Sequence, residues 1–155
     1  MGQARELMDR ITTAVMAGDR EALRQLYAAD AVAETPDAGR VEGGEAVAEY
    51  LMSFSRAFPD ASWEPRSTAE SGDTAIDEGY FLGTHTGVLG TPDGDIGPTG
   101  RHVRLRECDL LTVRDGLAVS HRFYFDQLDF MVQLGLVESG QLPGGAAPAP
   151  GATVG

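Results

Sequence analysis

Two runs of alternating side chains, residues 103–113 and 117–125, flank the sequence Arg114-Asp115-Gly116. Alternation with a period of two is typical of β-strands that bury one face, and a short Gly-containing connection between two such runs marks a hairpin. The segment therefore predicts a β-hairpin. A hairpin fixes the direction of both strands and the face on which each side chain lies.

The length of the hairpin loop decides which side chains face each other. If residues 114–116 form a three-residue loop, with Gly116 in the left-handed conformation, Asp109 lies directly opposite His121. Opposed residues on antiparallel strands have Cβ atoms roughly 4.5 to 5.5 Å apart, which lets a carboxylate hold an imidazole. A two-residue loop would instead pair Asp109 with Arg122.

In the three-residue register, one face of the hairpin is apolar apart from three ionisable side chains. Its members are Leu105, Glu107, Asp109, Leu111, Val113, Leu117, Val119, His121, Phe123 and Phe125. The opposite face is typical of a solvated or subunit-facing surface. It carries Arg104, Arg106, Cys108, Leu110, Thr112, Ser120, Arg122, Tyr124 and Asp126.

The ionisable side chains on the apolar face are candidate catalytic residues. Burial raises the pKa of a carboxyl, and Asp109 beside His121 could form an acid/base pair in an apolar pocket. The structural alternative is a polar pair that serves stability alone, or a face that is not the pocket. Glu107 lies one step along the same face, either as a second catalytic carboxyl or as the partner of an arginine from the helices.

Composition limits the classes of function. The chain has 155 residues, 42% of them hydrophobic, which fits one globular domain with a real core. A net charge of −12 with dispersed basic residues disfavours nucleic acid as a partner. The 12 basic residues are all arginine, which excludes Schiff-base and P-loop chemistry through a lysine.

Cysteine and histidine content, together with hydropathy, bears on cofactors and location. One cysteine, Cys108, cannot form an intramolecular disulfide, and three distant histidines have no spacing typical of a zinc site. We therefore expect no metal and no cofactor. Without a signal peptide or a run of 18 apolar residues, the chain is expected to be cytoplasmic and to have no membrane partner.

The order of elements predicts an α+β fold. Helical periodicity is present over residues 3–17, in a second helix to about Tyr27, and over residues 43–58, with a short strand, turn and strand from Ala31 to Val41. Strand-like segments then follow one another, which predicts an antiparallel sheet covered by the helices: 61–69, 74–87, 101–113 and 117–126.

The remaining segments are a loop, a short helix and a tail. Residues 88–100 contain too many Gly and Pro residues for regular structure and suit a mobile hairpin tip or rim. A short helix is expected between Leu128 and Leu134. The predicted domain spans residues 1–137, and residues 138–155, rich in Gly, Pro and Ala, form a tail that we expect to be disordered.

Aromatic side chains and a histidine outside the hairpin are candidates for the pocket wall. Tyr50, Phe54 and Trp63 fit core or pocket lining. Tyr80 could donate a phenolic hydrogen bond into the cavity, but either face of the strand that carries it could point inward. His85 flanks the Gly- and Pro-rich loop, where it could contact a ligand at the rim or simply be solvated.

Six short motifs occur in the order of the predicted elements: Gly43-Gly44, Phe58-Pro59-Asp60, Gly83-Thr84-His85-Thr86-Gly87, Pro98-Thr99-Gly100-Arg101, Asp115-Gly116 and Gln133-Leu134-Gly135. Together with that order, they resemble the SnoaL-like polyketide cyclases, within the nuclear transport factor 2 (NTF2) and ketosteroid isomerase-like superfamily. The resemblance covers roughly residues 3–136. It implies a cone-shaped NTF2-like fold, with three N-terminal helices packed on a curved antiparallel sheet around an apolar pocket, and a homodimer.

The resemblance does not carry over the family's catalytic pair. Cyclases of this family use a histidine on the penultimate strand and an aspartate on the last strand, and these positions fall on Asp109 and Phe123 here. The hairpin register offers Asp109 and His121 as the same two functional groups with the strands exchanged.

Three functions remain open from the sequence. The leading hypothesis is a cofactor-independent cyclase or isomerase that moves a proton on a small hydrophobic, polyketide-like or aromatic substrate. Catalysis would rest on Asp109, His121 and Glu107, with the substrate held by Tyr50, Phe54, Trp63, Tyr80, His85, Phe123 and Phe125. The alternatives are a non-catalytic binding or dimerisation module and an epoxide hydrolase or epoxide-opening cyclase.

Overall fold

The structure is a computed structural model that describes residues 2–138 and Gly140. Four helices accompany eight strands, and the predicted α+β architecture is confirmed. In chain order the elements are α1 (Gln3–Ala17), α2 (Arg20–Arg24), β1 (Tyr27–Thr35), β2 (Gly39–Glu42), α3 (Gly44–Ala57), β3 (Ser62–Ser71), β4 (Thr74–Thr84), β5 (Leu89–Thr91), β6 (Gly94–Ile96), β7 (His102–Arg114), β8 (Leu117–Phe125) and α4 (Gln127–Gln133).

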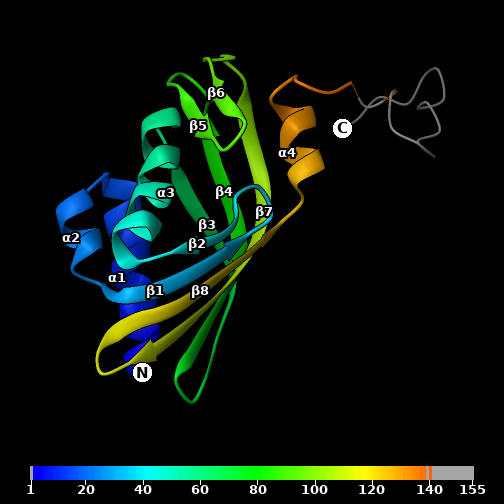
Figure 1. The fold of residues 1–155 in the computed structure, drawn as a ribbon. Helices are drawn as coiled ribbons and strands as arrows, with labels where there is room; N and C mark the ends of the chain where they lie inside the picture. Colours follow the sequence, from blue (N-terminus) through cyan, green and yellow to red (C-terminus); the bar gives the residue numbers. More distant parts are fainter. Residues whose placement is uncertain (1, 139, 141–155) are drawn as a thin grey trace.

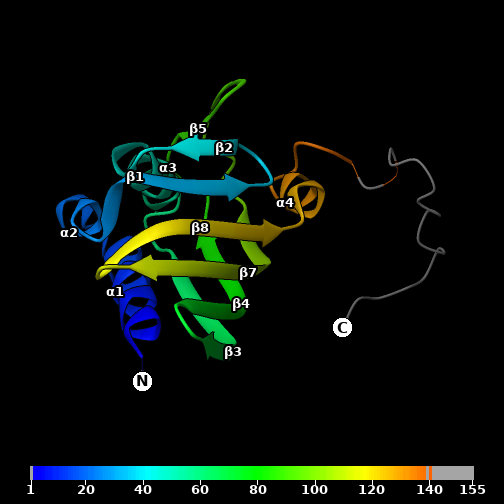
Figure 2. The same ribbon diagram turned by 60° about the horizontal axis from the view of Figure 1, so that its bottom comes forward.

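Six strands form one curved sheet in the order β2-β1-β8-β7-β4-β3 (Figure 2). Helices α1, α2 and α3 lie on one side of this sheet (Figure 1). The sheet is mixed, because β1 runs parallel to β8 while every other pair within it is antiparallel. The prediction of a wholly antiparallel sheet was therefore wrong at this one junction, where a strand from the N-terminal half of the chain pairs with the last strand.

The β7–β8 hairpin has a two-residue loop and a bulge. Asp115 and Gly116 both have positive φ, 52° and 78°, as a type I′ turn requires. Val119 is then an extra residue on β8, since Val113 pairs with Ala118 and the next residue, Thr112, pairs with Ser120. The predicted three-residue loop was wrong.

The bulge restores the alternation that a two-residue loop alone would have reversed. Beyond it, Asp109 pairs with Phe123 and Leu111 pairs with His121. Asp109 and His121 are therefore diagonal neighbours, not directly opposed ones, and both still face the helices. Near the turn, Ala118 is buried while Leu117 is 37% exposed, so the predicted inward positions of Leu117 and Val119 were wrong.

The sequence left open which face of β4 points inward, and the structure shows which face is buried. The buried residues of β4 are Ala75, Asp77, Gly79, Phe81 and Gly83, which alternate with partly exposed ones that include Tyr80. Gly79 is required there because the indole ring of Trp63 lies against it, and a Cβ at that position would come 2.6 Å from the ring.

Two clusters of buried side chains fill the space between helices and sheet. The larger joins α1, α2 and α3 to β1, β4, β7 and β8, with Leu7, Ile11, Leu51, Leu111 and Phe123 among its members. The smaller closes the other end, with Phe58, Phe81, Leu105, Phe130 and Leu134 among its members.

The C-terminal helix closes one end of the sheet. Asp126 caps α4 by accepting a hydrogen bond from the backbone N–H of Asp129 (3.0 Å). The side chain of Gln133 bonds the backbone of Arg104 on β7. Most of the predicted tail, residues 139 and 141–155, lies outside the described residues.

Two predicted segments differ from the structure. Helix α2 ends at Arg24, and Tyr27 begins β1 instead of ending a helix. The loop at 88–100 contains the short β5–β6 hairpin, whose Leu89 is buried against the smaller cluster. None of the described helices is both long and apolar enough to span a membrane.

An ion pair ties α1 to the middle of the sheet. Arg5 Nη2 donates to Asp77 Oδ2 (2.9 Å), and Nη1 donates to Asp77 Oδ1. Their side chains are only 10% and 7% exposed. Arg5 also donates to Asp9 Oδ1 through Nε (3.0 Å). Arg5 is the one buried arginine among the described residues.

We predict that Arg5→Met lowers the free energy of unfolding by about 3 to 5 kcal/mol, because it leaves the Asp77 carboxylate buried without its cation. The double variant Arg5→Met/Asp77→Leu should recover most of this loss, since it removes both charges. Urea unfolding monitored by circular dichroism measures both values.

The control is Arg24→Met, which removes an exposed arginine paired with Glu45. It should change the free energy of unfolding far less. If Arg5→Met and the double variant lose the same free energy of unfolding, the uncompensated charge of Asp77 is not the cause of the loss.

Candidate active site

A cavity of about 70 Å³ lies between the helices and the concave face of the sheet. Helices α1 and α3 and strands β3, β4, β7 and β8 contribute its wall: Ile11, Thr12, Val15, Met16, Tyr50, Leu51, Phe54, Trp63, Phe81, Leu105, Glu107, Asp109, His121, Phe123 and Phe125. The wall is mainly aromatic and aliphatic, with a few convergent polar groups. This composition is typical of a ligand site.

Two carboxyls from the same strand enter this apolar wall. Burial is the main reason that the pKa of Asp109 is raised to about 7; the neighbouring Glu107 carboxyl opposes this rise, and the charge of Asp77 adds to it. Burial, and then the charge of Asp109, raises the pKa of Glu107 well above its ordinary value. One proton is therefore shared within the pair near neutral pH.

A buried histidine and tyrosine flank the carboxyls. Tyr27 Oη and His121 Nδ1 are 2.6 Å apart, and His121 is 2% exposed. Burial lowers the pKa of His121 to about 3, against a weaker opposing effect of Asp77. Burial also raises the pKa of Tyr27 well above 10, as does the charge of Asp109. At neutral pH the imidazole is neutral and the phenol is protonated.

The tautomer of His121 follows from this arrangement. A phenol that donates to Nδ1 leaves the proton of the imidazole on Nε2, the atom nearer Asp109. Nε2 and Asp109 Oδ2 are 3.5 Å apart, and no hydrogen bond joins them. The predicted dyad thus shares the concave face, but its two members approach each other without bonding.

A second tyrosine carries a hydroxyl beside the carboxyls. Tyr50 Oη donates to Asp37 Oδ1 (2.8 Å), which lies in the turn between β1 and β2. Burial raises the pKa of Tyr50 well above 10, and the charges of Asp37 and Glu107 add to the effect. The phenol of Tyr50 therefore stays protonated.

Most of the predicted site residues meet in this cavity. Its wall includes all three predicted catalytic residues and five of the predicted binding residues: Tyr50, Phe54, Trp63, Phe123 and Phe125. The ring of Phe123 stacks on His121, with centroids 3.9 Å apart.

Two predicted binding residues lie elsewhere. Tyr80 is on the convex face, where the guanidinium of Arg104 lies 3.4 Å from the centroid of its ring. His85 is fully buried outside the cavity, stacked on Phe58, with Nδ1 accepting from the backbone N–H of Thr99 (3.2 Å). His85 therefore joins the segment before the β5–β6 hairpin to the segment after it, and neither Tyr80 nor His85 lines the cavity.

Tyr27, Arg5 and Asp77 are site residues that the sequence reasoning missed. Tyr27 reaches His121 only because β1 pairs with β8 in parallel, a pairing that leaves no local signal. An arginine close to the apolar stripe of the first helix was a usable signal for Arg5. Among the described residues, no three His, Cys, Asp or Glu side chains are grouped so that they could hold a metal ion.

Comparison with known proteins agrees with the fold. The family model of the SnoaL-like domain matches residues 8–121. The chain belongs to the SnoaL-like domain family. A search of curated proteins finds no match to this sequence.

Solved structures of SnoaL-like and related proteins share this architecture. A proposed SnoaL-like polyketide cyclase from Jannaschia sp. CCS1 is 20% identical, with a TM-score of 0.75 over 87% of this chain and 93% of that chain. IdmH, a proposed polyketide cyclase from Streptomyces antibioticus, is 27% identical, with a TM-score of 0.69 over 86% of this chain and 99% of that chain. An epoxide hydrolase from M. tuberculosis of the LEH-like type is 19% identical, with a TM-score of 0.66 over 85% of this chain and 89% of that chain.

We predict that Tyr27→Phe destabilises this SnoaL-like domain by about 1 to 3 kcal/mol, because it leaves a buried nitrogen of His121 without a partner. The matched control is Tyr124→Phe, which removes a hydroxyl from a side chain that is 55% exposed. Urea unfolding of the two variants measures the difference, and equal stabilities would contradict the buried bond.

Proposed function

We propose that this SnoaL-like protein is a general acid/base enzyme that moves a proton on a small hydrophobic carbonyl compound, as in aldol cyclisation or isomerisation. The observation that carries the proposal is a carboxyl, Asp109, whose pKa is about 7, in a cavity with aromatic walls. A catalytic base is most effective when its pKa lies near the working pH.

Asp109 and Glu107 would divide the chemistry between them. The carboxylate of Asp109 removes a proton from the carbon beside the carbonyl, and the protonated carboxyl of Glu107 donates to the carbonyl oxygen. The opposite protonation states that this requires are supported by the mutual effect of the two groups on their pKa values. The aromatic wall would hold the substrate with its reacting carbon at Asp109.

His121 fits a supporting role better than that of a base. An imidazole with a pKa of about 3 is a weak proton acceptor at neutral pH, and its Nδ1 faces Tyr27. Its neutral Nε2–H can orient the Asp109 carboxylate or a substrate oxygen. The SnoaL-like histidine and aspartate positions hold Asp109 and Phe123 here, so the proposal rests on this chain's own residues.

Epoxide opening is a second candidate, and the same carboxyl pair favours it. A carboxylate can activate water or an internal hydroxyl while a second carboxyl protonates the leaving oxygen, which needs one charged and one neutral group. The structurally similar LEH-like protein from M. tuberculosis is an epoxide hydrolase, which is consistent with this chemistry in the same fold.

We predict that Asp109→Asn lowers the rate of α-proton exchange of a small ketone in D2O by about 100-fold or more, because it removes the base and keeps its shape. Cyclopentanone is small enough for the narrow cavity, and NMR follows the exchange of its α-protons. Hydrolysis of cyclohexene oxide tests the epoxide-opening candidate. For the wild type, kcat/KM should rise with pH through about 7, as Asp109 ionises.

The control is Asp93→Asn, at an exposed carboxylate in the β5–β6 turn, which should leave the rate unchanged. Thermal melts show whether each variant is folded. Full activity in folded Asp109→Asn would end the catalytic assignment, and saturable binding without turnover of either compound would favour the non-catalytic module.

We also propose a homodimer built on the convex face of the sheet. Partly exposed Leu110 and Cys108 and the exposed ring of Tyr124 lie there beside Arg104 and Arg106. A surface that mixes apolar area with charge suits a self-complementary interface.

Light scattering at micromolar concentration should therefore give twice the chain mass of 16.4 kDa. Leu110→Asp should reduce it to one chain mass, because a buried charge disfavours the interface. Val88→Asp, at an apolar side chain that is 51% exposed near the β5–β6 hairpin, is the control and should leave the dimer intact. A monomeric wild type would contradict the proposal.

A further inference from the structure

Charge in the interior of the protein is unbalanced. Carboxyls of Asp77, Glu107 and Asp109 lie on the concave face of β4 and β7, and the one buried arginine of the described residues, Arg5, is bound to Asp77. His121 is neutral and adds no positive charge. With one proton shared by Glu107 and Asp109, the cavity holds about one negative charge that no protein cation neutralises.

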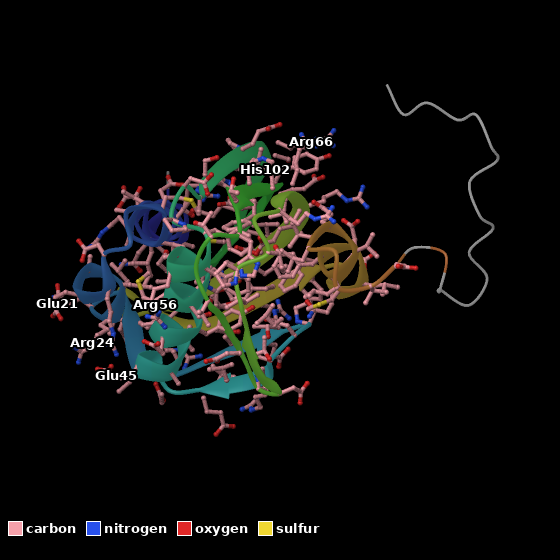
Figure 3. All side chains as sticks on the ribbon, turned by 90° about the horizontal axis from the view of Figure 1, so that it is seen from above. Glu21, Arg24, Glu45, Arg56, Arg66 and His102 are labelled. Atoms are coloured by element: carbon pink, nitrogen blue, oxygen red, sulfur yellow. The ribbon has the colours of Figure 1, made fainter. Side chains whose placement is uncertain are left out.

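Arginines at the surface do not correct this imbalance, because their partners lie outside the cavity. Arg24 bonds Glu45 and Glu21 at the exposed edge of α2 and α3 (Figure 3). Arg56 pairs with Glu49 on the exposed side of α3. Arg66 lies with Tyr80 on another part of the surface.

Two polar atoms at the cavity have no partner within the protein. Asp109 Oδ1 is buried and makes no hydrogen bond, although it can accept two. His121, which is 2% exposed, also lines the cavity with its unpaired Nε2. Buried polar atoms without a protein partner in a cavity call for a ligand or water there.

Aromatic rings face the same space. Tyr50 and Phe54 from α3 pack edge to face (5.3 Å between centroids), and Phe123 lies 5.8 Å from Tyr50. Trp63 and Phe81 complete this wall from β3 and β4. Faces of aromatic rings attract cations, most strongly where water is excluded.

We propose that the cavity selects substrates that carry a single protonated amine, with the ammonium group against Asp109 and Glu107 and the apolar body among the aromatic rings. This inference rests on the function proposed above, since the same carboxyls would bind the amine and move the proton. An ammonium group supplies the missing charge and the donors for Asp109 Oδ1. A substrate carboxylate or phosphate would meet like charge instead.

The amine also suits the proposed chemistry. Removal of a proton beside a carbonyl develops negative charge on the substrate oxygen, to which the protonated Glu107 carboxyl would donate; the described residues that line the cavity include no cation to add to this stabilisation. A substrate ammonium held at Asp109 would lie close to that oxygen. It would also keep Asp109 in the carboxylate form, ready to accept a proton.

Three probes of matched shape test the selectivity: tert-butylammonium, tert-butanol and pivalate. Trp63 is the only tryptophan in the chain and lines the cavity, so its fluorescence reports binding. At pH 8 the cation should bind at least about tenfold more tightly than the alcohol, and pivalate should bind most weakly. Equal or tighter binding of the alcohol or of pivalate, or no saturable binding of the cation, would overturn the proposal.

The affinity for tert-butylammonium should rise between pH 6 and pH 8, because Asp109 is ionised above about 7. The ionisable groups around Asp109 come from five other elements and its own strand: Arg5 (α1), Tyr27 (β1), Tyr50 (α3), Asp77 (β4), Glu107 (β7) and His121 (β8). Of these, Tyr27 stays protonated and His121 stays neutral over this range. An affinity that does not change with pH would contradict the role of Asp109.

Asp109→Asn should weaken binding of tert-butylammonium about tenfold and leave that of tert-butanol nearly unchanged. Glu107→Gln provides a second variant with the same expectation, and Asp93→Asn is the control for a distant carboxylate. Unchanged cation binding in both folded variants would overturn the proposal. If the protein catalyses proton exchange of the ketone but does not prefer the cation, only the inference about amine substrates is contradicted. If it prefers the cation but turns over neither the ketone nor the epoxide, only the proposed catalysis is contradicted.

Discussion

The buried ion pair between Arg5 and Asp77 sets the electrostatics of the whole interior. It holds α1 against β4 and uses the one buried cation of the described residues. Asp109 lies directly opposite Asp77 on β7 and is left without a counter-charge. Burial is the main cause of its raised pKa, and the charge of Asp77 adds to it, because ionisation would place a second, unpaired charge in the same apolar region. A structural contact thereby shapes the chemistry of the neighbouring carboxyl.

Most of the fold could be predicted from local sequence patterns. One error of that prediction has a local cause, the hairpin loop, and another has a long-range cause, the pairing of β1 with β8. Asp115-Gly116 correctly marked the turn, but a two-residue loop and a bulge replaced the predicted three-residue loop. The shorter loop and the bulge each shift the register of β8 by one residue, in the same direction, which makes a total shift of two. The alternation of inward and outward side chains is therefore kept, and Asp109 and His121 still reach the same cavity. The parallel pairing of β1 with β8 joins residues about 90 positions apart in sequence, and period-two patterns carry no information on such partners.

The site residues on the predicted hairpin could be identified from the sequence. Those whose position depends on the pairing of strands far apart in the chain could not. Glu107, Asp109 and His121 were found because they interrupt an apolar face. Tyr27 was predicted at the end of a helix, because the second helix was expected to run three residues beyond its observed end at Arg24, which hid the start of β1. The orientation of Tyr80 depended on the register of β4, which only its pairing with β7 determines.

Burial divides the roles of the polar groups. It penalises the charged form of each group, so it makes the imidazole of His121 a weaker base and the carboxyls stronger ones. A pair of carboxyls that shares one proton then offers an acid and a base in the same small space at neutral pH. His121 accepts a hydrogen bond from Tyr27 at Nδ1, so its own N–H donor is on Nε2. In the proposed mechanism, residues of β7 transfer the proton, and β8 supplies a neutral donor and the stacked ring of Phe123.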